Sequence, residues 1–138
     1  MRYTLLCLAL IFPAAQADDA PLDVMRSLLL ALQTNDDSNA GIAQVFDQAA
    51  PSNKAATGPL PRFISMVSRH PYVELLQHQS ADIGPALARG NTQQYPIRLI
   101  TKTGHAMGYL WTLEQQPNQQ WMTTTVRPVA LGQSIKGL

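Results

Sequence analysis

The spacing of apolar residues changes once along this chain, at Pro71, and that change limits the possible folds more than any other feature. Before Pro71, apolar residues recur at positions i, i+3, i+4 and i+7, which is the spacing of one helix face. After it, they alternate with other residues, as in strands with one buried face. Because the helices precede the strands, the sequence predicts an α+β domain with helices on one face of an antiparallel sheet.

Three segments before Pro71 carry the helical spacing. Their apolar positions are Met25, Leu28, Leu29 and Leu32; Ile42, Val45, Phe46 and Ala49; and Leu60, Phe63, Ile64 and Val67. Such stripes are more typical of a core than of a cofactor site, because helices bury them against a sheet or one another. We therefore expect Phe46 and Phe63 to be buried against the strand face that carries Tyr109 and Trp111.

The boundaries of these helices are marked by polar residues, glycine and proline. The first helix should begin near Pro21, and the polar cluster after it offers Asp37 or Ser38 as the N-cap of the second. Proline cannot continue a helix, so the second should end at Pro51. The following segment 52–63, SNKAATGPLPRF, is interpreted as a structural corner rather than a functional loop, because its glycine and prolines serve as stop and start signals.

Three later segments alternate apolar and other residues or are rich in β-branched residues: 95–100, 107–114 and 121–126. Turn signals lie between them at 102–104 and 116–118. Their spacing of about ten residues fits an antiparallel meander. Pro96 marks an edge, a strand start or a bulge, because proline cannot donate a hydrogen bond to the sheet. Residues 130–138 show no sustained period and are expected to form a loosely held tail.

The first 17 residues, MRYTLLCLALIFPAAQA, have the features of a secretory signal peptide. A basic residue, Arg2, precedes a short apolar run, and Ala15 and Ala17 form an Ala-x-Ala cleavage site. The run is far shorter than the ~20 apolar residues of a membrane-spanning helix, so an N-terminal anchor is the weaker interpretation. We predict cleavage after Ala17, one α+β domain over residues 18–129, and a periplasmic or secreted location.

Composition and charge exclude several classes of function. Of the 138 residues, 46% are hydrophobic and 14% charged, which suits one compact domain. Without the signal, nine basic residues face nine acidic ones, so neither nucleic acid nor stable membrane association is expected. The sole cysteine, Cys7, lies in the signal, so the mature chain has no disulfide, thiol nucleophile or Cys-ligated metal.

Several segments resemble a family of small exported bacterial domains known as domain of unknown function 4864. They are Asp36-Asp37, FDQAAPSN at 46–53, PLPRFISMV at 59–67, Tyr72, and the strand pair that ends at Trp121. The order of elements also resembles the cone-shaped fold of nuclear transport factor 2-like and SnoaL-like proteins. The resemblance implies three helices packed on a curved β-meander. The family has no established activity, so it transfers no functional residue.

The leading functional hypothesis is a non-catalytic module that binds a small apolar ligand between helices and sheet. Tyr95, Tyr109, Trp111 and His78 are the candidate ligand-binding residues, because they combine apolar bodies with polar tips. The same aromatic residues on an inward strand face are also explained by simple core packing. No catalytic residue and no cofactor is assigned. The spacing of the three histidines does not place two ligands on one face, so no metal site is expected.

Two alternatives belong to other classes. An isomerase or dehydratase would use a carboxylate in the apolar cavity as a proton shuttle, and Asp47, Asp82 and Glu114 are the candidates. We expect binding rather than catalysis, since a lone carboxylate is usually solvated. A dimerising interaction protein would instead pair through an exposed sheet face and form a homodimer.

Overall fold

The computed structural model describes residues 19–131; the predicted signal peptide and residues 132–138 lie outside this range. The described residues form four α-helices, one 3₁₀ helix and five strands. The helices are α1 (Asp19–Gln33), α2 (Ala40–Asp47), α3 (Pro51–Thr57), α4 (Leu60–Val67) and the 3₁₀ helix η1 (Tyr72–Leu75). The strands are β1 (Ser80–Ile83), β2 (Leu87–Arg89), β3 (Thr92–Ile100), β4 (Ala106–Gln115) and β5 (Trp121–Val129).

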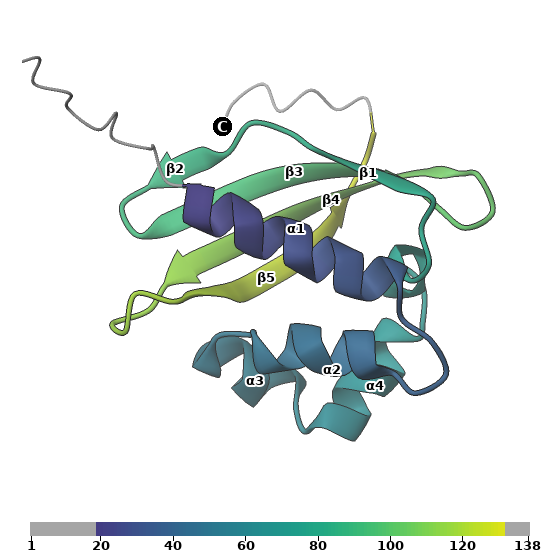
Figure 1. The fold of residues 1–138 in the computed structure, drawn as a ribbon, viewed down its shortest axis with the longest axis horizontal. Helices are drawn as coiled ribbons and strands as arrows, with labels where there is room; N and C mark the ends of the chain where they lie inside the picture. Colours follow the sequence, from purple (N-terminus) through teal and green to yellow (C-terminus); the bar gives the residue numbers. More distant parts are fainter. Residues whose placement is uncertain (1–18, 132–138) are drawn as a thin grey trace, which may run out of the picture.

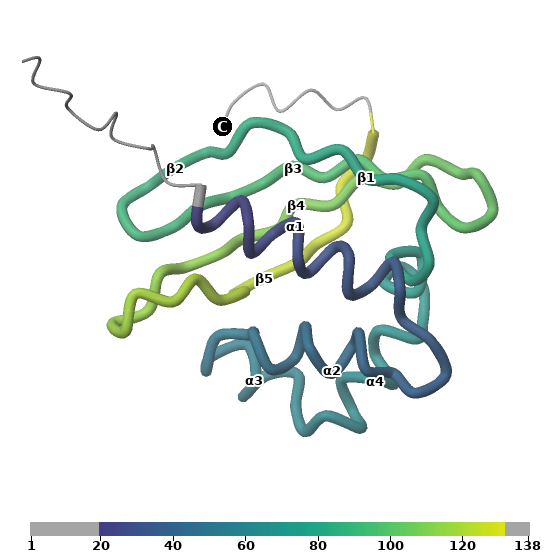
Figure 2. Tube along the Cα trace, in the orientation of Figure 1, coloured from purple at the N-terminus to yellow at the C-terminus, as the bar shows by residue number. Residues whose placement is uncertain are grey.

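The strands form one antiparallel sheet in the order β1-β3-β4-β5, and β2 also pairs with β3. Helix α1 crosses one face of this sheet, whereas α2, α3 and α4 form a group beyond the β5 edge (Figure 1). Figure 2 traces the chain from α1 through that group and back to β1 at the opposite edge. Helices followed by an antiparallel sheet confirm the predicted α+β fold class.

The inner face of the sheet, which packs against α1, carries alternate residues of each strand. The strand register places its aromatic residues side by side. Tyr95 lies opposite Trp111, and Trp111 lies opposite Val126 on β5. A register shift at Thr112/Leu113 marks a bulge where β5 pairs with β4. The inner-face residues of β3 and β4 are buried, and so is the stripe of α1 that packs on them. Hydrophobic burial at this helix–sheet contact is the main stabilising term of the domain.

The prediction of three helices is wrong by one: the described residues contain a further helix, α3, inside the segment interpreted as a corner. Helix α2 ends at Asp47, and the chain then runs alongside β5. The Ala50 N–H donates to Thr123 O at 2.8 Å, and the Thr123 N–H donates to Gln48 O at 3.1 Å. Pro51 therefore begins a helix instead of ending one, because its fixed φ and missing N–H suit the first helical position.

The predicted N-cap position of α2 is also wrong, although the Ser38 hydroxyl accepts from the Ala40 N–H, the first of the helix, at 3.3 Å. Asn39, with φ 58°, occupies the N-cap position, and no side chain there caps the helix. The Asp36 carboxylate instead accepts hydrogen bonds from the N–H and hydroxyl of Ser38, and these bonds lower the pKa of Asp36. The buried Asn35 provides the cap from outside the helix, because its Oδ1 accepts from the Ile42 N–H at 3.1 Å.

The aromatic pair between α2 and α4 is confirmed for one residue only. Phe63 is 6% exposed and belongs to the core, whereas Phe46 is half-buried and packs against it. Their ring centroids are 5.1 Å apart, and Lys54 Nζ lies 5.8 Å from the centroid of the Phe46 ring. Beside the Phe46 ring lie Lys54 of α3 and Gly58, which connects α3 to α4 and has no side chain to cover the ring.

Candidate functional site

A cavity of about 320 Å³ lies between β5 and the group of α2, α3 and α4. Its deepest residues are apolar and come from four elements and from η1: Leu32, Val45, Phe63, Val67, Leu75 and Trp111. Residues 123–126 of β5 form one wall, and α3 contributes Ser52, Asn53, Ala56 and Thr57 to the other.

Three polar side chains of the lining are paired within the protein. Trp111 Nε1 donates to Thr123 Oγ1 at 2.9 Å, and Asn53 Nδ2 donates to the Thr124 carbonyl at 2.8 Å. The Tyr72 hydroxyl donates to the Val126 carbonyl at 3.0 Å. These bonds fix α3 and η1 to β5 and hold the cavity between them open.

The lining is uncharged. Among the described residues that line this cavity there is no aspartate, glutamate, lysine, arginine or histidine. Tyr72 is the one lining residue with an ordinarily titratable group, and its hydroxyl is engaged with β5.

The structure brings one of the four candidate ligand-binding residues to this cavity. Trp111 lines it and is 1% exposed. Tyr95 is buried on β3 and borders a separate open depression between α1 and β1. His78 is buried behind η1, where its Nδ1 lies 2.8 Å from the Leu75 carbonyl oxygen. Ligand binding by any of these residues stays a prediction.

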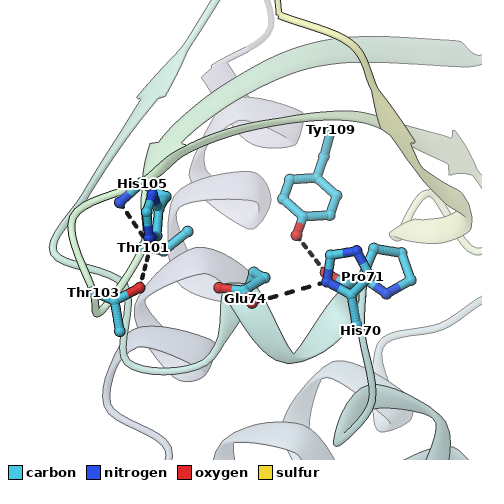
Figure 3. Close-up of polar contacts among 7 residues, drawn as sticks. All are labelled: His70, Pro71, Glu74, Thr101, Thr103, His105 and Tyr109. Atoms are coloured by element: carbon cyan, nitrogen blue, oxygen red, sulfur yellow. Dashed lines mark hydrogen bonds and ion pairs between the residues drawn. The ribbon is translucent and has the colours of Figure 1, made fainter.

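The fourth candidate, Tyr109, does not line the cavity, and its hydroxyl points toward Pro71 at the start of η1 (Figure 3). Its hydroxyl donates to the Pro71 carbonyl at 2.6 Å, and burial raises the pKa of the phenol well above its usual value. In the same view His70 Nδ1 lies 3.9 Å from a Glu74 carboxylate oxygen, and His70 is largely exposed. The Tyr109–Pro71 bond joins the start of η1 to β4, and none of these four residues lines the cavity.

The candidate carboxylates for proton transfer lie elsewhere. Asp47 is exposed at the end of α2, Asp82 is exposed on β1, and Glu114 is half-buried near the end of β4. None of the three lines the cavity beside β5. Within residues 19–131, no three histidine, cysteine or acidic side chains gather closely enough to hold a metal ion. No helix in the described part of the chain has the length and apolar content needed to cross a membrane.

Sequence reasoning missed the residues of the wall and mouth. The wall consists of residues 123–126 of β5, and the mouth of Ser52 and Ala56 on α3. Pro51 before two alanines could have predicted α3, because proline is frequent at the first position of a helix. The approach of α3 to β5 has no comparable local signal.

A family model described as a domain of unknown function, DUF4864, matches residues 15–133. The chain belongs to this family. The match to DUF4864 covers every element of the described fold and confirms the family resemblance of the sequence. No curated protein matches the chain. One solved structure similar to it is a designed nuclear transport factor 2-like protein titled Rd1NTF2_05_I64F_A80G_T94P_D101K_L106W. The identity is 11% and the TM-score 0.49, and the match covers 80% of this chain and 97% of the designed one.

Proposed function

We propose that this DUF4864 domain is a non-catalytic binding module that holds a small apolar molecule in the cavity beside β5. The observation that carries the proposal is the cavity itself, about 320 Å³ with a mainly apolar lining. Cavities of about 300–1,000 Å³ with apolar walls and few polar groups are typical of small-molecule sites. Its uncharged lining favours binding over proton transfer.

A ligand would enter past α3. Ser52 and Ala56 both line the cavity and are both exposed, one helical turn apart. They therefore form its mouth. Ala55 is also exposed on α3 but does not line the cavity, so it offers a matched control position.

Binding is tested with N-phenyl-1-naphthylamine, an uncharged apolar dye whose fluorescence rises in apolar surroundings. We expect saturable binding with quenching of tryptophan fluorescence, because Trp111 lines the cavity. Ala56→Phe should weaken binding by about tenfold or more, because losing the contacts of a blocked site costs at least ~1.4 kcal/mol. Ala55→Phe, which adds the same ring outside the mouth, should bind like the original chain. No saturable binding, or equal binding by a folded Ala56→Phe variant, would contradict the proposal.

We also propose that the domain works outside the cytoplasm, in the periplasm or as a secreted protein. The apolar run and the Ala15-Gln16-Ala17 site support this, and they lie outside the described residues. The mature chain is expected to begin at Asp18. N-terminal sequencing of protein from a periplasmic fraction checks this, and recovery of chains with Met1 from the cytoplasm alone would refute it. Homodimerisation through the outer sheet face stays a prediction.

A further inference from the structure

We infer that the cavity selects uncharged ligands that carry a hydrogen-bond acceptor, and that the backbone N–H of Val126 donates to this acceptor. The inference rests on the proposed binding function and specifies its ligand class. It follows from two independent properties of the site: the charge of the lining and the direction of one backbone group of β5.

The first property is the absence of a counter-charge among the described lining residues. Burying a neutral polar group without a hydrogen-bond partner costs on the order of 2–7 kcal/mol. Burying an ionised carboxylate or ammonium without a partner costs considerably more. Lys54 is the one charged residue of α3, but it does not line the cavity and lies over the Phe46 ring. A charged ligand would therefore have to keep its charge outside the mouth.

The second property is the direction of the β5 edge. Thr123 turns both its N–H and its carbonyl away from β4, because they bond Gln48 and Ala50. Val126 turns its carbonyl the same way, since it accepts from the Tyr72 hydroxyl. The N–H and C=O of one strand residue point to the same side, so the Val126 N–H also points away from β4 and toward the cavity that Val126 lines.

Three side-chain donors beside the cavity are committed to other groups of the protein. Trp111 Nε1, Asn53 Nδ2 and the Tyr72 hydroxyl each donate to another group of the protein. A ligand oxygen near Val126 thus meets a backbone donor rather than a competing acceptor. A ketone, ester, amide or alcohol oxygen satisfies this N–H, and burying such a donor without a partner is unfavourable.

The test displaces N-phenyl-1-naphthylamine with ligands of one chain length: methyl decanoate, 1-decanol, decanoate and decylammonium. The ester and the alcohol should bind at least about tenfold more tightly than either ion, a difference of ~1.4 kcal/mol. Ala56→Phe should lower the affinity for all four ligands, whereas Ala55→Phe should keep both the affinities and their ranking. In ¹H–¹⁵N spectra, the Val126 amide proton should move downfield with methyl decanoate.

The outcomes separate this inference from the proposed function. Failure of the dye and all four ligands to bind would contradict both. Binding of decanoate or decylammonium as tightly as the ester would overturn the charge selection while leaving a binding module. Tight binding of the ester with no change at the Val126 amide would overturn the assignment of the donor.

Discussion

Replacing Phe63 with alanine should lower the free energy of unfolding by about 3–5 kcal/mol, the usual cost of removing a buried aromatic ring. The ring is almost fully buried, packs on Phe46 and forms part of the cavity lining. A domain of this size has only ~5–15 kcal/mol of stability, so the loss would be severe. Urea unfolding followed by far-UV circular dichroism measures it.

Lys54→Ala is the control for Phe63→Ala, because Lys54 lies on the neighbouring helix and contacts the same aromatic pair from outside. From the sequence alone, its loss would change stability by less than ~0.5 kcal/mol, as for most surface substitutions. The position of Nζ over the Phe46 ring raises the expected loss to about 0.5–1 kcal/mol. Equal and small losses in both variants would contradict the core position of α4.

The second large effect is expected at Gly41, where α2 crosses α1. A Cβ atom added there would lie 2.0 Å from the Ala31 carbonyl oxygen and 3.0 Å from Asn35 Cβ. The first neighbour is backbone of α1 and cannot rotate away, so the helices must separate. Gly41→Ala should therefore destabilise the domain by about 1–3 kcal/mol or more, as overpacking does.

The sign of this effect is diagnostic, because replacing glycine with alanine inside a helix ordinarily increases stability by about 0.5–1 kcal/mol. Gln44→Ala on the same helix is the control, since Gln44 is exposed and its replacement should change stability by less than ~0.5 kcal/mol. Thermal and urea unfolding of the two variants provide the comparison. A stabilised Gly41→Ala protein would show that α1 and α2 do not approach as closely as described.

Periodicity predicted the elements that bury a whole face. The stripes at Met25–Leu32 and Leu60–Val67 became α1 and α4, and the alternation around Trp111 became β4. Short elements were missed for a physical reason. Strands β1 and β2 have four and three residues, too few for alternation to stand out, and α3 has no buried residue to create a stripe.

The candidate site was predicted less well, because alternation assigns a face of the sheet but not the neighbours of a residue on it. Tyr95, Tyr109 and Trp111 do share the inner face. Only Trp111 reaches the cavity, since α1 covers the inner face near β3 and the other helices lie beyond β5. That placement depends on contacts between residues more than 70 positions apart, such as Asn53 with Thr124.

Both edges of the sheet are partly covered or interrupted, and this affects self-association. An open strand edge is a template on which a second chain can add a strand and start aggregation. Residues 48–50 occupy part of the β5 edge, and Pro128 further along it has no N–H to offer. The opposite edge is broken into β1 and β2 by residues 84–86. Copies of the domain are therefore expected to resist edge-to-edge polymerisation when crowded, and any pairing between them would have to use a face.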